Sequence, residues 1–151
     1  CASYEPQLQQ LVSDLPETLR IVFRHFPLPQ HGQAELMARA AEAANQQGKF
    51  WEMHDLIYAK QGEWQGKANA KEYAMGYAQE LNLNQDQFAQ DLYANDITDV
   101  IARGKGEAQA LEAPGTPAFY LNGQRLENPR SYDDFKQVIQ SATAALAQPV
   151  Q

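Results

Sequence analysis

The stretch "GTPAFYLNGQRLEN", residues 115–128, predicts a β-hairpin in a chain that otherwise reads as mostly helical. Two short segments with apolar and aromatic residues flank Asn122 and Gly123. Asn-Gly favours a two-residue hairpin turn, because both residues tolerate the positive φ that such a turn requires. We therefore expect a strand at 118–121 that pairs with the residues after the turn.

A helix is expected after the hairpin. Ser131 is followed three positions later by Asp134, an arrangement typical of a helix N-terminus. The apolar residues that follow recur at the spacing of one helix face, namely Phe135, Val138, Ile139 and Ala142.

Helical patterns also fill the region before the hairpin, from His31 to about Leu111. Gly48 is expected to end a first helix, and "KFWEMHDLIYAKQGEW", residues 49–64, is expected to form the next one. Asn84, with Gln87 three positions later, matches a capping box. The aromatic residues Phe50, Trp51 and Trp64 are expected in the interior of this helical block.

Two further elements precede the block. "LRIVFRHFPL", residues 19–28, alternates Ile21 and Phe23 with Val22 and Arg24 and ends in proline, so we expect a strand at 19–26. Before it, apolar residues at three- and four-residue steps predict a first helix, with Cys1 close to its N-terminus. The residues of that apolar face are Tyr4, Leu8, Leu11, Val12 and Leu15.

The expected order is helix, strand, helical block, hairpin, helix, which is an α/β arrangement. It has at most three strands, and no strand leads into the first helix. We therefore expect that a strand belongs before residue 1, and that the chain lacks a central strand without it. Unpaired backbone groups cost about 1–3 kcal/mol each, so we expect the chain to fold poorly by itself.

Composition excludes several classes of function. Twelve Lys and Arg against nineteen Asp and Glu give a formal net charge of −7, which argues against nucleic-acid binding because phosphates repel acidic surfaces. No apolar run approaches the roughly 20 residues of a membrane helix. The 151 residues are enough for one compact domain with a buried core.

Four stretches together resemble the DsbA-like branch of the thioredoxin superfamily. They are "CASYEPQLQQL", "IVFRHFPL", "AAEAANQQGKFWEMHDLIYAKQGEW" and "GTPAFYLNGQRL", in that order. The resemblance covers nearly the whole chain and implies a thioredoxin-like α/β fold with an inserted helical domain. It implies a core of residues 1–30 and 112–151 and an insertion of residues 31–111.

The same resemblance implies the site. In the family a Cys-x-x-Cys pair lies at the N-terminus of the first helix, and "CASYEP" matches from the second cysteine, so Cys1 is expected to be the resolving cysteine. The first cysteine and its strand would then lie upstream. The family also places a cis-proline opposite the pair, beside backbone that binds substrate, and Thr116 and Pro117 match it. No dissociable cofactor and no metal are implied.

The resemblance implies a thiol–disulfide oxidoreductase that acts on peptide or protein thiols with a redox partner protein, in a bacterial periplasm or another extracytoplasmic space. The rival is a non-catalytic thioredoxin-fold module that binds peptides. Cys1 is the only cysteine, and a lipid-modified residue or an inert thiol remain alternatives. His25, His31 and His54 lack paired metal-ligand spacing, and His54 is expected to be a packing residue. Glu5 favours the helix N-terminus by its charge or assists proton transfer.

Overall fold

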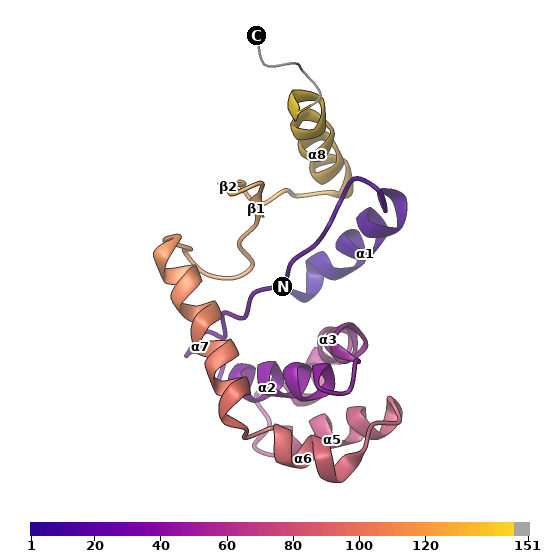
Figure 1. Cartoon of the computed structure of the whole chain (residues 1–151), viewed down its shortest axis with the longest axis vertical. Helices are drawn as coiled ribbons and strands as arrows, with labels where there is room; N and C mark the ends of the chain where they lie inside the picture. Colours follow the sequence, from indigo (N-terminus) through magenta and orange to yellow (C-terminus); the bar gives the residue numbers. More distant parts are fainter. Residues whose placement is uncertain (147–151) are drawn as a thin grey trace. The chain divides into compact units, whose positions relative to one another are not determined.

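The computed structural model describes residues 1–146, which form two compact units (Figure 1). The first unit holds Cys1, Ser3–Phe23 and the chain from Pro117 onward. The second holds Arg24–Thr116 together with Ala2. The chain passes between the units at Phe23 and again at Thr116, so the second unit is inserted into the first.

The first unit consists of helices and a small sheet. A 3₁₀ turn, η1 (Ala2–Tyr4), leads into α1 (Glu5–Asp14), and the unit ends with α8 (Tyr132–Leu146). Strands β1 (Tyr120–Leu121) and β2 (Gln124–Arg125) pair antiparallel. Asn122 and Gly123 between them have φ of 50° and 82°, so the expected Asn-Gly hairpin is confirmed.

Helices α1 and α8 bury a small apolar core between them. Leu11 of α1 and Phe135 and Ile139 of α8 are its buried residues. Val12 was expected on the same face, but its side chain is 42% exposed. The residues packed around this core are Tyr4, Leu8, Leu15, Leu19, Phe119, Leu121 and Tyr132.

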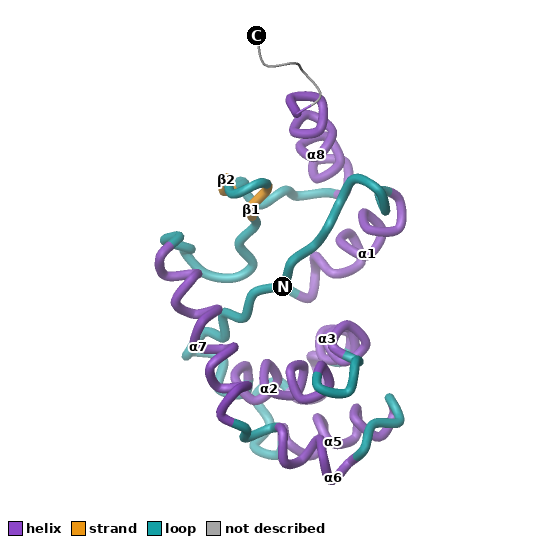
Figure 2. The backbone as a smooth tube through the Cα atoms, in the orientation of Figure 1, coloured by secondary structure: helices purple, strands orange, loops and turns teal. Residues whose placement is uncertain are grey.

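The strand expected at 19–26 is not formed. Residues 19–28 are neither helix nor strand, and they follow the loop trace between α1 and α2 in Figure 2. Burial still alternates along the segment, with Ile21 and Phe23 half-buried and Val22 and Arg24 exposed. A strand needs backbone hydrogen bonds to a neighbour. The described residues contain only the two-stranded sheet β1–β2, and neither of its strands pairs with this segment.

The second unit is helical, as the sequence predicts. Two of its helices, α3 and α4, replace the single helix expected through Trp64, because the helix ends at Ala59 and a new turn begins at Gln61. Trp51 is 44% exposed rather than interior, whereas Trp64 is buried. The helices are α2 (Ala34–Asn45), α3 (Phe50–Ala59), α4 (Gln61–Trp64), α5 (Ala70–Glu80), α6 (Gln85–Asp91) and α7 (Asn95–Ala110).

Helix α2 is the centre of this unit and contacts α3, α5, α6 and α7. Its alanines, among them Ala40 and Ala44, are fully buried, and their small side chains let the neighbouring helices approach closely. Larger residues such as Met53 and Phe88 fill the spaces between helices. Half of the capping box expected before α6 is formed, because Asn84 Oδ1 accepts the backbone N–H of Gln87 at 3.0 Å, whereas the Asn84 N–H donates to Gln47 Oε1 at 2.8 Å.

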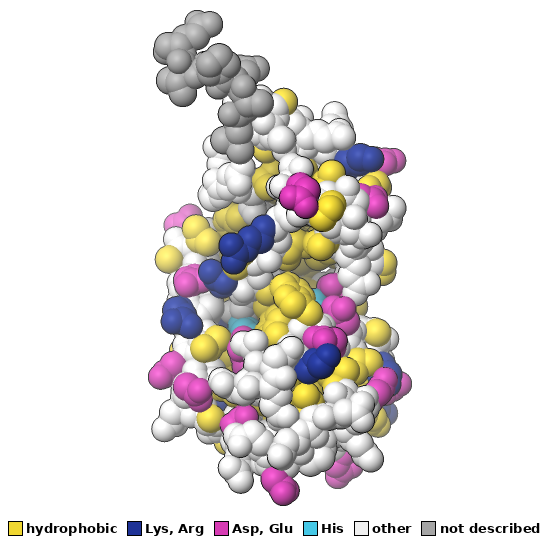
Figure 3. Space-filling view, turned by 45° about the vertical axis from the view of Figure 1, so that its right-hand side comes forward, with side chains coloured by type: hydrophobic (Ala, Val, Ile, Leu, Met, Phe, Trp, Pro, Cys, Tyr) yellow, Lys and Arg dark blue, Asp and Glu magenta, His cyan; other side chains and the backbone are white. Residues whose placement is uncertain are grey.

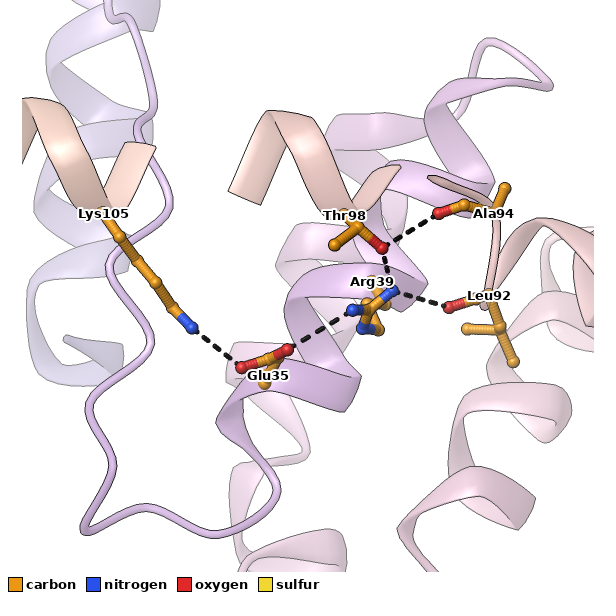
Figure 4. Close-up of polar contacts among 6 residues, drawn as sticks. All are labelled: Glu35, Arg39, Leu92, Ala94, Thr98 and Lys105. Atoms are coloured by element: carbon orange, nitrogen blue, oxygen red, sulfur yellow. Dashed lines mark hydrogen bonds and ion pairs between the residues drawn. The ribbon is translucent and has the colours of Figure 1, made fainter. Parts of the chain in front are cut away.

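Polar contacts join α2 to α7 (Figure 4). Arg39 donates to Thr98 Oγ1 at 3.0 Å and to the carbonyl oxygen of Leu92 at 3.5 Å. Glu35 accepts from Arg39 at 3.4 Å and from Lys105 at 2.8 Å. The hydrogen bond from Lys105 is the main reason that the pKa of Glu35 lies below its usual value.

Within residues 1–146 no helix is both long enough and apolar enough to cross a membrane. On the face drawn in Figure 3, Lys and Arg occur singly or in small groups among acidic and uncharged side chains. This distribution agrees with the net charge of −7, and the absence of a nucleic-acid partner stays a prediction.

Candidate functional site

Cys1 lies directly before the first helical turn. Its carbonyl oxygen accepts the backbone N–H of Tyr4 at 2.8 Å, which begins η1, and α1 follows without interruption. Pro6 is in the first turn of α1, where its missing N–H costs least. The expected position of Cys1 at a helix N-terminus is confirmed. The thiol is free and exposed, so as a thiolate it can attack a disulfide from outside.

An aromatic cluster connects this helix to the hairpin and to α8. The ring of Tyr4 lies 5.1 Å from that of Phe119 and 6.1 Å from that of Phe135, between ring centroids. Phe119 and Phe135 meet edge to face at 5.1 Å. Tyr4 is three residues from Cys1 and Phe119 is two residues from Pro117. The cluster therefore anchors the chain near both candidate site residues within the first unit.

The second part of the site is the segment Thr116–Pro117, which leads into β1. Thr116 is exposed and Pro117 is half-buried. The side-chain amide of Asn128 donates to the carbonyl oxygen of Pro117 at 2.8 Å. Of the three predicted site residues, Cys1 and Pro117 belong to the first unit, and Thr116 is the last residue of the second.

A buried hydrogen-bonded pair of a histidine and a carboxylate lies in the second unit. His25 Nε2 and Glu42 Oε1 are 2.8 Å apart, the ring N–H donating to the carboxylate, and Asn45 donates to Glu42 Oε2 at 3.0 Å. Burial alone would raise the pKa of Glu42, but these hydrogen bonds outweigh it and the pKa lies below its usual value. His25 is thus used as a hydrogen-bond donor that holds the segment after Phe23 against α2.

His54 of α3 is a packing residue, as expected. Its ring lies among the aromatic rings of Phe50, Trp51 and Tyr58, with centroids 4.9–5.9 Å away. Its Nδ1 is 3.0 Å from Asp55 Oδ1. The ring of Phe50 stacks on that of His54, whereas Trp51 and Tyr58 meet it edge to face.

Sequence reasoning did not find Asn128 or the pairing of His25 with Glu42. A signal for Asn128 existed, because a hairpin centred on Asn122-Gly123 places residue 128 opposite residue 117. No comparable signal existed for Glu42, which lies on a helix face that otherwise carries alanines. Its partner comes from an extended segment 17 residues earlier.

Curated relatives match this chain over most of its length. The Na(+)/H(+) antiporter NhaA 1 of Salinispora arenicola is 37% identical over 145 residues, which are 95% of this chain and 21% of that protein. NhaA 3 of Salinispora tropica is 36% identical over 146 residues, 96% of this chain and 22% of that protein. The antiporter NhaA of Herminiimonas arsenicoxydans is 35% identical over 133 residues, which are 88% of this chain and 20% of that protein. The chain thus spans about a fifth of the length of the curated relatives it matches.

A solved structure shows the fold. The crystal structure of a thioredoxin-like oxidoreductase from Silicibacter pomeroyi matches with a TM-score of 0.79 and 27% sequence identity, covering 95% of this chain and 79% of that chain. The fold is therefore thioredoxin-like, an α/β fold with inserted helices. A sequence-family model described as Thioredoxin matches residues 1–141. This chain belongs to the thioredoxin family.

Proposed function

We propose that the chain is the greater part of a DsbA-like thiol–disulfide oxidoreductase that acts on peptide or protein thiols, with Cys1 as its resolving cysteine. The observation that carries the proposal is the exposed thiol of Cys1 directly before a helix, in a member of the thioredoxin family. A helix N-terminus favours a thiolate because its partial positive charge stabilises the anion. We place the protein in the periplasm or another extracytoplasmic space, where disulfides persist.

The proposed reaction needs a second, nucleophilic cysteine three positions before Cys1. Its thiolate attacks a substrate disulfide, forms a mixed disulfide and releases one substrate thiolate. The Cys1 thiolate then attacks the enzyme sulfur of that mixed disulfide. A disulfide forms within the enzyme, the second substrate thiolate leaves, and two electrons have passed to the substrate. A redox partner protein with a dithiol restores the reduced pair, and the reverse sequence oxidises a substrate dithiol.

Two further parts complete the proposal. The alternating burial of residues 19–26 without a ladder supports a preceding strand that pairs with them and ends at the first cysteine. Thr116 and Pro117 would face the cysteine pair, with a cis peptide bond between them and the Thr116 backbone available to bind a substrate strand. An X-Pro bond adopts the cis form at low cost.

The similarity to Na(+)/H(+) antiporters favours a second candidate function. The match covers 95% of this chain but only 21% of one such antiporter. The chain would then serve as a thioredoxin-fold module linked to a transporter. Such a module would bind a peptide segment without turnover. The gene sequence upstream of Cys1 distinguishes the candidates: Cys-x-x supports the enzyme, and any other residue three positions before Cys1 supports the binding module.

Activity of the parent polypeptide tests the proposal. We expect the chain as printed above to show little or no turnover in insulin reduction, because one cysteine cannot resolve a mixed disulfide. The parent polypeptide with Cys-x-x should reduce insulin or oxidise a reduced protein. Its Cys1→Ser variant should accumulate mixed disulfides that a reducing agent releases, visible on non-reducing gels.

A matched control is Ser13→Ala, which changes an exposed hydroxyl on the same helix and should leave both activity and trapping unchanged. If the parent polypeptide exchanges no dithiol and its Cys1→Ser variant traps no substrate, the oxidoreductase proposal fails.

A further inference from the structure

The hairpin register places Asn128 directly opposite Pro117. Tyr120 pairs with Arg125 and Leu121 with Gln124, so each step back from Tyr120 corresponds to a step forward from Arg125. Phe119 therefore faces Leu126, and the backbone N–H of Leu126 donates to the carbonyl oxygen of Phe119 at 2.9 Å.

In an antiparallel ladder, hydrogen-bonded pairs occur at every second position. After Phe119 and Leu126, the next such pair is Pro117 and Asn128. Proline has no N–H, so it cannot donate to this pair. Its carbonyl oxygen can still accept, and it does so from the side-chain amide of Asn128 at 2.8 Å.

The direction of this hydrogen bond is unambiguous. The carbonyl oxygen of Pro117 can only accept, so Asn128 Nδ2, and not Oδ1, must face it. The side chain of Asn128 thus supplies a donor at the position where the hairpin ladder reaches Pro117. Leu, Asp or Glu at this position would leave the carbonyl oxygen without that donor.

We propose that Asn128 is a positioning residue that holds the Pro117 peptide, and through it the Thr116 backbone, in the conformation that receives a substrate peptide strand. This inference rests on the proposed oxidoreductase function. Asn128 does not touch the reacting sulfurs, and its effect is on the binding of substrates with a peptide backbone.

The test compares two substrates with the parent polypeptide. One is a short peptide with an intramolecular disulfide, and the other is hydroxyethyl disulfide, which has no peptide backbone. Asn128→Asp keeps the size of the side chain and removes the donor, and Asn128→Ala removes the group without adding charge. Gln124→Glu, an exposed amide-to-carboxylate change on the same hairpin, is the control for added charge.

Both Asn128 variants should raise KM for the peptide about fivefold or more, with a smaller change in kcat. The ratio of kcat/KM for the peptide to kcat/KM for hydroxyethyl disulfide should fall about fivefold, whereas Gln124→Glu should keep the wild-type ratio. If the ratio is unchanged in both Asn128 variants, the positioning role is wrong although the oxidoreductase function stands. If the wild type exchanges neither substrate, it is the proposed function that fails.

A measurement on the unmodified parent polypeptide tests the contact itself, even where a variant fails to fold. The side-chain NH₂ protons of Asn128 should exchange with solvent more slowly than those of exposed Gln124 in NMR spectra. Equal exchange rates for the two side chains would overturn the proposal.

Discussion

The rings of Tyr4 and Phe119 lie in contact, with centroids 5.1 Å apart and planes inclined at 55°, although the two residues come from opposite ends of the chain. Tyr4 follows Cys1 at the start of the first helix, and Phe119 follows Pro117 at the start of the hairpin. The relative position of the two candidate site segments therefore depends on aromatic packing in the first unit.

We expect Phe119→Leu to destabilise the first unit by about 1–2 kcal/mol, because it removes ring contacts with both Tyr4 and Phe135. Urea unfolding followed by circular dichroism measures the change. Tyr93→Leu removes an aromatic ring that is 59% exposed and serves as the control. A destabilisation by Phe119→Leu no larger than that of the control would contradict the role of the cluster.

Two glycines of α7 provide a matched pair. A Cβ at Gly104 would lie 2.5 Å from the carbonyl oxygen of His25, so the backbone would have to move, and we expect Gly104→Ala to cost about 1–3 kcal/mol. A Cβ at Gly106 meets no atom within 4 Å. Gly106→Ala should stabilise the helix by about 0.5–1 kcal/mol. Thermal melts that shift in the same direction for both variants would contradict the close packing at Gly104.

The buried carboxylate of Glu42, hydrogen-bonded to His25, predicts a pH dependence of stability. The pKa of Glu42 lies below its usual value of 4.5, so the ionised carboxylate stabilises the fold above that pH. This contribution is lost as pH falls through the lowered pKa in the folded state. At pH 7 we expect Glu42→Gln to cost about 1 kcal/mol, since a neutral hydrogen bond replaces a charge-assisted one.

The difference in the free energy of unfolding between wild type and Glu42→Gln should shrink as the pH is lowered below about 4.5, where wild-type Glu42 also becomes neutral. Glu52→Gln, which removes the carboxylate of the exposed pair with Lys49, should have little effect at any pH. A Glu42→Gln effect that is constant from pH 3 to pH 7 would show that the charge of Glu42 does not contribute.

Arg39 and Lys105 both contact Glu35 but should differ in their contribution. Arg39 also donates to Thr98 and to the carbonyl oxygen of Leu92, and its side chain is 17% exposed. We expect Arg39→Met to cost about 1–2 kcal/mol. Lys105→Met removes one surface ion pair and should cost about 0–1 kcal/mol. Urea unfolding measures both costs, and 1 M NaCl should appreciably reduce only the cost of Lys105→Met, because salt screens exposed ion pairs. Equal costs for the two variants at low salt would contradict this difference.

Most of the local structure of this protein could be predicted from neighbouring residues in the sequence. Asn122-Gly123 turns the hairpin, Asn84 caps α6, and the apolar spacing from Leu8 to Leu11 makes α1 one-sided, because turns, caps and helix faces depend on neighbours a few residues away. The position of Cys1 before the first helix follows from the same local rules.

Contacts between residues far apart in the sequence depend on the packing of the folded chain. Residues 19–26 have a strand pattern but form no strand, since a ladder requires a partner. Trp51 is exposed although the pattern favours burial, and Glu42 is buried because His25 arrives beside it. The hairpin brings the side-chain amide of Asn128 to the carbonyl oxygen of Pro117. Proline has no N–H, so a full backbone ladder cannot form at this pair. The pairing of His25 with Glu42 depends on how the whole chain packs, and no local spacing encodes it, whereas the hairpin register already places Asn128 opposite Pro117.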